Sequence, residues 1–171
     1  MKIQIPELSL VVLVGSSSSG KSTFARTHFR PTEVLSSDRF RGLIADDEND
    51  QSVSEQAFEV LHMVAAKRLA LGRLVVIDAT NVQSKARRPL LELAARHHVL
   101  AVAIVFDLPE PLLIERHQRR TDRPFGEAVV RLHYQQLKRA LPSLQREGFH
   151  RIFILYSEAE VAAAAVVRQL I

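Results

Sequence analysis

One octapeptide near the N-terminus has the residue types and the spacing of a phosphate-binding loop. It matches G-x-x-x-x-G-K-[ST] in full and is followed by Thr23: Gly15, Ser16, Ser17, Ser18, Ser19, Gly20, Lys21, Ser22. An apolar segment precedes it and a helical pattern follows it, so its backbone N–H groups would wrap a β-phosphate at a helix N-terminus. Lys21 would reach the β- and γ-phosphates, and the Ser22 hydroxyl would ligate Mg²⁺. The loop predicts that this chain binds a nucleoside triphosphate.

Two acidic residues follow predicted strands at the same edge of a sheet. Asp38 follows the second strand, where an acid can accept the proton of an acceptor hydroxyl aimed at the γ-phosphate. Arg41, three residues on, could hold an anionic part of that acceptor. Asp78 ends an apolar segment and could hold Mg²⁺ directly or through water. The alternatives are local: Asp38 as a helix cap beside a solvated Arg41, and Asp78 with Asn81 as ties of the next turn.

A run of arginines in the second half of the chain could contact the triphosphate. Placed on an α-helix, four of them fall within a stripe roughly 100° wide: Arg116, Arg119, Arg120 and Arg123. Guanidinium groups on one face repel one another unless an anion lies among them, and arginine binds phosphate bidentately. We interpret the run as a lid in which Arg116, Arg120 and Arg123 bind ATP. The alternative is a solvated face tempered by Glu115 and Asp122.

Other residue clusters do not predict chemistry. The acidic run at 46–50 lacks the spacing of an EF-hand and is interpreted as a solvated loop. The seven histidines show no zinc spacing, and there is no cysteine, which excludes disulfides, Cys-ligated zinc, iron–sulfur clusters and a thiol nucleophile. Aromatic residues make up 6% and tryptophan is absent, so no stacking platform for single-stranded nucleic acid is visible.

Length and composition fit one soluble domain. The chain has 171 residues, with 23 Lys and Arg against 19 acids, a mild positive excess of +4. The longest apolar runs, such as Val99–Phe106, are far shorter than the ~18 residues of a membrane span. Leu8–Val14 leads into the phosphate loop and not into a signal-peptide cleavage site. We therefore expect a cytoplasmic protein that does not bind a membrane.

Short apolar segments alternate with helical patterns along the chain. The predicted strands are Leu8–Val14, Glu33–Ser36, Leu74–Asp78, His98–Phe106 and Arg151–Tyr156. Five helix starts are predicted: by capping boxes at Ser52 and Ser157, by a capping serine at Ser84, and by prolines at Pro111 and Pro124. The helix after Ser52 would end at Gly72, and the helix after Ser157 would be the Ala-rich final helix. The alternation predicts a three-layer α/β domain over residues 1–171, a P-loop phosphotransferase fold with a parallel five-stranded sheet and a helical arginine lid.

With these residues assembled, the chain resembles the kinase domain of bacterial polynucleotide kinase-phosphatase, the end-healing and end-sealing RNA repair enzyme. The resemblance runs nearly from end to end. Its specific stretches are Gly15–Thr23, Ser36–Asp38 with Arg41–Leu43, Asp46–Ser52, Phe58–His62, Asp78–Gln83, Arg120–Arg123 and Leu144–Phe149. It implies transfer of the γ-phosphate of ATP, with Mg²⁺, to the 5′-hydroxyl end of RNA or DNA.

The resemblance also implies a role for individual residues. Lys21 and Ser22 would serve ATP and Mg²⁺, and Asp38 would be the general base. Arg41 would contact the phosphate 3′ of the acceptor nucleoside. The remaining roles are two pairs: Arg116 and Arg120 would clamp the donor phosphates, and Gln51 and Val129 would sandwich the terminal base.

Two departures from the family pattern and two other functions stay open. Ser18 stands where the family loop often has glycine, which matters if that position needs a positive φ. Family members continue into phosphatase and ligase domains, so the resemblance implies that this chain is the kinase domain of a longer protein. A small-metabolite kinase of the same fold and a nucleotide-dependent binding module are the alternatives; Asp38, Arg41 and Gln51 favour a nucleic-acid end. The sequence does not decide between RNA and DNA, or between a monomer and a homodimer.

Overall fold

The central sheet has five parallel strands in the order β3-β4-β2-β5-β6, in a computed structural model that describes residues 1–171. The strands are β2 (Ser9–Gly15), β3 (Val34–Ser36), β4 (Val75–Asp78), β5 (Leu100–Phe106) and β6 (Arg151–Leu155). The predicted α/β class and the five-stranded parallel sheet are confirmed. The parallel register aligns Ser36 with Asp78 and Gly15 with Phe106, which brings their following loops to one edge.

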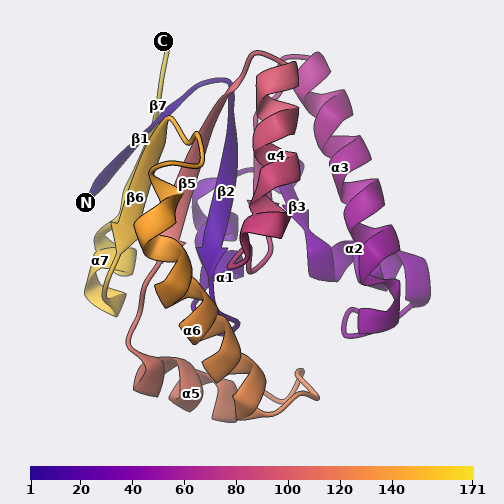
Figure 1. The fold of residues 1–171 in the computed structure, drawn as a ribbon, viewed down its shortest axis with the longest axis vertical. Helices are drawn as coiled ribbons and strands as arrows, with labels where there is room; N and C mark the ends of the chain where they lie inside the picture. The colour runs from indigo at the N-terminus through magenta and orange to yellow at the C-terminus, as the bar shows by residue number, and fades with distance from the viewer.

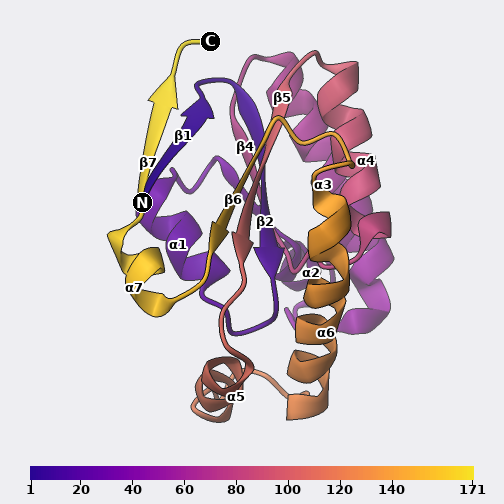
Figure 2. The same cartoon turned by 60° about the vertical axis from the view of Figure 1, so that its left-hand side comes forward.

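Helices cover both faces of this sheet (Figures 1 and 2). They are α1 (Lys21–His28), α2 (Ser37–Ala45), the 3₁₀ turn η1 (Gln51–Val53), α3 (Ser54–Ala70), α4 (Ser84–Arg96), α5 (Glu110–Gln118), α6 (Glu127–Leu144) and α7 (Glu158–Ala163). Figure 2 shows α3, α4 and α6 on one side and α1 and α7 on the other, with α5 beyond the carboxyl ends of the strands. None of these helices combines the length and the apolar character that crossing a bilayer requires.

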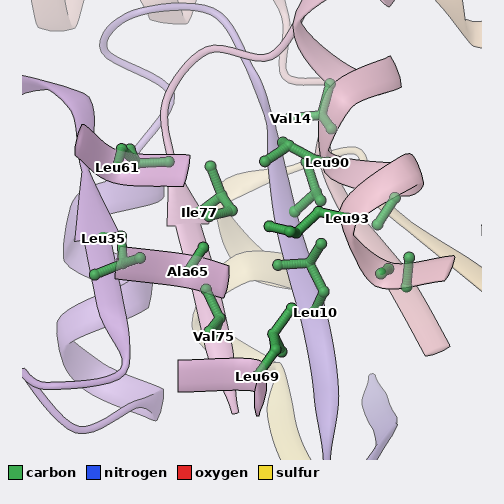
Figure 3. Close-up of a cluster of buried hydrophobic side chains, with 14 of the residues drawn as sticks. Leu10, Val14, Leu35, Leu61, Ala65, Leu69, Val75, Ile77, Leu90 and Leu93 are labelled. Carbon is green, nitrogen blue, oxygen red and sulfur yellow. The ribbon is translucent and has the colours of Figure 1, made fainter. Parts of the chain in front are cut away.

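The three layers follow from the alternation of side chains along fully buried strands. Leu10 and Val14 of β2 pack under α3 and α4 in one apolar cluster (Figure 3), whereas Val11 and Leu13 pack with Phe24 of α1 in a second cluster. All seven residues of β2 are buried. A strand buried on both faces needs a continuous apolar run, which is why the sequence pattern located it.

The two ends of the chain form a second, two-stranded sheet that the sequence analysis missed. β1 (Lys2–Pro6) pairs in parallel with β7 (Ala165–Gln169). The predicted Ala-rich final helix is therefore wrong beyond Ala163. Its capping residue is correct, because Ser157 accepts a hydrogen bond from the Glu160 N–H (3.1 Å), but the helix is only six residues long. Val166 and Val167 then favour the strand.

Three other predicted helix starts need correction. Ser52 does not cap a helix: Asp50 accepts hydrogen bonds from its N–H (2.9 Å) and its hydroxyl (2.6 Å), and α3 begins at Ser54. α4 begins at Ser84 but has no side-chain cap. α6 begins three residues after Pro124, at Glu127. These differences move element ends by a few residues and leave the order of elements unchanged.

Candidate functional site

A single cleft of about 1370 Å³ lies at the carboxyl edge of the sheet and contains nearly all the predicted site residues. Its walls come from the phosphate loop, α1, α2, η1, the segment after β4, the α5–α6 region and α7. The predicted residues that line it are Ser17 to Thr23, Asp38, Arg41, Gln51, Asp78, Arg116, Arg119, Arg120, Arg123 and Val129. Gly15 and Ser16 are buried beneath it.

The phosphate loop has the backbone conformation that its motif predicts. Gly20, at the N-cap of α1, has φ 91°, in the region that glycine favours. A Cβ on Gly15 would lie 3.0 Å from the Phe106 Cβ, so a larger residue would push β2 and β5 apart by a few tenths of an ångström. Ser18, where the family often has glycine, has φ 67°. The chain thus adopts the left-handed conformation with a serine, at a cost of roughly 1 kcal/mol.

Lys21 is buried under the loop and bound by the loop's own oxygens. Its Nζ donates to the Ser16 carbonyl (2.7 Å) and to the Ser19 hydroxyl (3.2 Å). Burial lowers the pKa of Lys21 to about 8, although the nearby charges of Asp78 and Asp38 act in the opposite direction. Phosphate oxygens would replace neutral oxygen acceptors with charged ones, so a triphosphate would stabilise the ammonium form.

Ser22 and Asp78 lie side by side next to Lys21. The Ser22 hydroxyl donates to Asp78 Oδ2 (2.7 Å). Burial raises the pKa of Asp78, while the Lys21 charge and the Ser22 hydrogen bond lower it. No group of three acidic, histidine or cysteine side chains forms a protein-only metal cage. One hydroxyl and one carboxylate suit Mg²⁺, which keeps waters and binds substrate phosphates.

Asn81 ties down the turn after β4, as one of the two sequence interpretations expected. This role does not exclude the other interpretation, in which Asp78 holds Mg²⁺. Its Nδ2 donates to the Leu13 carbonyl of β2 (2.8 Å), and the Gly15 N–H donates to the Thr80 carbonyl (2.9 Å). Asn81 therefore ties the segment after β4 to the strand that leads into the phosphate loop. Asp78 does not take part in this turn and instead accepts the hydrogen bond from Ser22. The turn interpretation thus applies to Asn81, and the Mg²⁺ interpretation to Asp78.

Asp38 is not the cap of α2, and its side chain is half-buried in the wall of the cleft. The cap of α2 is Ser36, whose hydroxyl accepts from the Arg39 N–H (3.4 Å). The carboxylate of Asp38 instead forms salt bridges with two arginines, Arg41 through Oδ1 and Arg123 through Oδ2. Arg41 is buried and its Nε also donates to the Glu48 carbonyl (2.9 Å). Both local alternatives for Asp38 and Arg41 are wrong.

The predicted arginine stripe is also wrong, because α5 ends at Gln118. Only Arg116 lies on the helix; Arg119 is its C-cap, and Arg120 and Arg123 lie in the segment that follows. Pro124 disfavours helical backbone at the residue before it, which keeps Arg123, the last residue of the stripe, out of a helix. The lid is therefore the last turn of α5, which carries Arg116, followed by a loop that carries Arg120 and Arg123.

Each lid arginine has a carboxylate partner in this structure. Arg116 donates to Glu158 of α7 (2.6 Å) and to the Ser18 carbonyl (3.4 Å). Arg120 pairs with Asp122 (2.8 Å). The side chain of Arg119 is 76% exposed and pairs with Glu115. Arg116 thus lies against the phosphate loop, whereas Arg119 faces solvent.

The acidic run at 46–50 contains a residue that the sequence analysis missed. Asn49 accepts a hydrogen bond from Arg123 Nη1 (3.1 Å) and donates to the Asp122 carbonyl (3.0 Å). The loop after α2 and the segment after α5 are thereby joined next to Asp38. The run is therefore not merely a solvated loop, because Asn49 ties it to the segment after α5.

α6 contributes a second missed residue. His133, one helical turn after Val129, lines the cleft, and its Nδ1 accepts a hydrogen bond from the Ser17 N–H (3.4 Å). The Ser16 hydroxyl donates to the Val130 carbonyl (3.1 Å). Burial and the Lys21 charge lower the pKa of His133 to about 4, so the ring is neutral near pH 7. A lone histidine without metal spacing offered no signal in the sequence.

Comparisons with known proteins agree with this fold. The model of an AAA domain family, AAA_33, matches residues 10–146. No curated protein sequence matches the chain. A chain in the structure of the Pnkp1/Rnl/Hen1 RNA repair complex is similar at 24% identity and TM-score 0.70, over 82% of this chain and 47% of that one.

Two kinase structures are similar as well. A putative kinase from Chloroflexus aurantiacus J-10-fl has 16% identity and TM-score 0.63, over 89% of this chain and 86% of that one. Shikimate kinase from Acinetobacter baumannii has 20% identity and TM-score 0.54, over 91% and 88%. At these identities the likeness is one of fold. The resemblance seen in the sequence is confirmed at that level, and the chain spans about half of the RNA repair protein it matches.

Proposed function

The chain belongs to the AAA_33 family of AAA domains, and from that premise we propose that it transfers the γ-phosphate of ATP to the 5′-hydroxyl end of RNA or DNA. The kinase-type P-loop fold supports a phosphotransferase. The proposal concerns this kinase step alone, because the chain spans 47% of the RNA repair protein that it resembles.

The observation that carries the proposal is an acid beside the phosphate loop that the loop itself does not use. Asp38 lines the same cleft as Lys21, and no hydrogen bond joins it to the loop. A carboxylate there can accept the proton of an acceptor hydroxyl. The buried Arg41 next to it can bind an anion on the same acceptor, as a nucleotide's 3′-phosphate would require.

The donor side has its own set of groups. The loop N–H groups and Lys21 would hold the triphosphate, and Arg116 lies against the loop at Ser18. Ser22 and Asp78 would hold Mg²⁺, which when bound neutralises charge on the β- and γ-phosphates. Gln51 and Val129 line the acceptor side of the cleft from η1 and α6, which fits the proposed sandwich of the terminal base.

The direct test is transfer of label from γ-labelled ATP to a 5′-hydroxyl oligonucleotide, with Asp38→Asn as the diagnostic variant. We expect Asp38→Asn to lower transfer by ~10²- to 10⁴-fold, the usual contribution of a general base. Calorimetric ATP binding should persist, because the phosphates are held elsewhere. Asp46→Asn is the matched control: it removes an exposed acid at the end of the same helix, at a left-handed position that asparagine tolerates.

The alternatives predict different results in that assay. A nucleotide-dependent binding module would bind ATP and label no acceptor. A small-metabolite kinase would label a small hydroxyl compound, for which shikimate is a natural probe because the shikimate kinase fold is similar. Normal oligonucleotide transfer by folded Asp38→Asn would show that another group activates the hydroxyl, with Asp78 the next candidate.

A further inference from the structure

Seven arginines line the cleft, and only two of them lack a carboxylate partner. Arg41 and Arg123 pair with Asp38, while Arg116, Arg119 and Arg120 pair with Glu158, Glu115 and Asp122. Arg26 of α1 donates only to the Thr23 hydroxyl (3.2 Å), and Arg39 of α2 makes no side-chain hydrogen bond. Both side chains are exposed.

Both arginines line the cleft, Arg26 from α1 and Arg39 from the start of α2. Arg26 is one helical turn after Ser22, and its charge acts on Asp78. Arg39 directly follows Asp38. The other cleft residues of α1 and of the turn into β3 are not acidic, and the two nearby carboxylates, Asp38 and Asp78, form no salt bridge with either arginine. Arg26 and Arg39 therefore add two positive charges to the cleft that no salt bridge neutralises.

The nucleotide and the nearest acceptor phosphate already have other binding groups. The triphosphate is assigned to the loop, Lys21 and the lid, and the phosphate 3′ of the terminal nucleoside to Arg41. A nucleoside 3′-phosphate acceptor offers no further anion, whereas a longer strand carries one negative charge per nucleotide beyond it. Guanidinium groups match phosphate oxygens in a planar, bidentate geometry.

We propose, resting on the proposed kinase function, that Arg26 and Arg39 bind the downstream phosphodiesters of a polynucleotide acceptor. Such contacts hold the strand without reading its bases. They would make the enzyme prefer an oligonucleotide over a mononucleotide at one and the same catalytic centre.

The test is a ladder of 5′-hydroxyl acceptors: a nucleoside 3′-phosphate, a dinucleotide and a tetranucleotide with 3′-phosphates, and a decamer. kcat/KM is measured for the wild type, Arg26→Ala, Arg39→Ala and the double variant. Arg73→Ala with Arg96→Ala is the control, since both are exposed, lie outside the cleft and remove the same total charge. They lie at the opposite edge of the sheet, before β4 and at the end of α4.

We expect the wild-type kcat/KM to rise about tenfold or more from the nucleoside 3′-phosphate to the tetranucleotide. The double variant should lose that rise while its kcat/KM for the nucleoside 3′-phosphate changes about twofold or less. Each lost contact should also lower the slope of log(kcat/KM) against log[salt] for the decamer by about 0.7, so the double variant by about 1.4. The control should keep the rise and the slope.

Each other outcome overturns a distinct statement. Failure of the wild type to label any oligonucleotide refutes the proposed kinase function. Wild-type transfer that does not depend on acceptor length, or a double variant that behaves like the control, refutes the strand contacts alone. An equal loss on every acceptor, nucleoside 3′-phosphate included, would assign Arg26 and Arg39 to the donor or to the first phosphate and also refutes the proposal.

Discussion

Replacing Glu147 with alanine tests how the segment behind Asp78 is held in place. Glu147 follows α6, and its two carboxylate oxygens accept hydrogen bonds from Arg87 Nε (2.7 Å) and Nη2 (2.6 Å). Arg87 Nη1 donates to the Asn81 carbonyl (2.7 Å). The Arg87 side chain is 1% exposed and that of Glu147 16%. The pair therefore connects the end of α6 to the turn that follows Asp78.

Removal of Glu147 leaves a buried guanidinium without its counterion. Breaking a buried pair in this way costs about 3–5 kcal/mol of unfolding free energy. For a domain of this size each kcal/mol lowers Tm by about 2–4 °C, so we expect Glu147→Ala to lower Tm by roughly 6–20 °C. Urea unfolding monitored by circular dichroism measures the free energy, and a thermal melt measures Tm.

The double variant Arg87→Met with Glu147→Leu checks the reason for that loss. It removes both charges and fills the space with apolar groups, so it should be more stable than Glu147→Ala. A loss below about 1 kcal/mol for Glu147→Ala would show that water or another group compensates Arg87. A double variant less stable than Glu147→Ala would show that the hydrogen bond to Asn81, and not the unpaired charge, dominates.

Two further predictions concern the lid and the buried lysine. In steady-state kinetics, Arg116→Ala and Arg120→Ala should each lower transfer ~10³-fold or more. Arg119→Ala should change transfer by no more than about threefold, because the Arg119 side chain is 76% exposed. An essential Arg119 together with a dispensable Arg120 would contradict the lid assignment. Folding lowers the pKa of Lys21 from 10.5 to about 8, so the unfolded chain binds the Lys21 proton at a higher pH than the folded protein does. The free energy of unfolding of the ATP-free protein should therefore decrease as pH falls from 10.5 to 8, and Lys21 should cause no further decrease below pH 8. A triphosphate should restore the charge, so calorimetry in buffers of different ionisation enthalpy should show proton uptake on ATP binding above pH 8, absent in Lys21→Met.

The sequence predicted the parts of the fold that depend on local pattern. Fully buried strands such as β2 and β5 are continuous apolar runs, and the phosphate loop is a contiguous motif with its own backbone geometry. β7 was assigned to a helix because alanines at 162–165 favour helix, and only its pairing with β1 makes Val166 and Val167 a strand. β1 and β7 lie at opposite ends of the chain, so no local sequence pattern could predict their pairing.

The site residues that the sequence analysis missed make contacts between segments that are distant in the chain. Asn49 meets Asp122, and His133 meets Ser17, through single residues with no repeated spacing. The prediction of the arginine stripe is wrong for a related reason: it assumed a helix up to Arg123. Arg120 and Arg123 lie instead in a loop, where they pair with Asp122 and Asp38. The family resemblance, by contrast, depends on separated stretches, and the structure gives a physical reason for two of them: Glu147 and Asn81 meet through Arg87.

The position of Arg123 joins the donor and acceptor halves of the proposed reaction. The sequence assigned it to ATP, yet in this structure it pairs with Asp38 Oδ2, while Arg41 occupies Oδ1. An acceptor hydroxyl that gives its proton to Asp38 must compete with one of these guanidinium groups. The Arg41 side chain is 8% exposed and its Nε is bound by the Glu48 carbonyl, whereas that of Arg123 is 14% exposed, lies in the lid and leaves its Nε without a hydrogen-bond partner. Arg123 is therefore the partner that can leave, and a triphosphate that attracts it would free the base at the moment when the donor is in place.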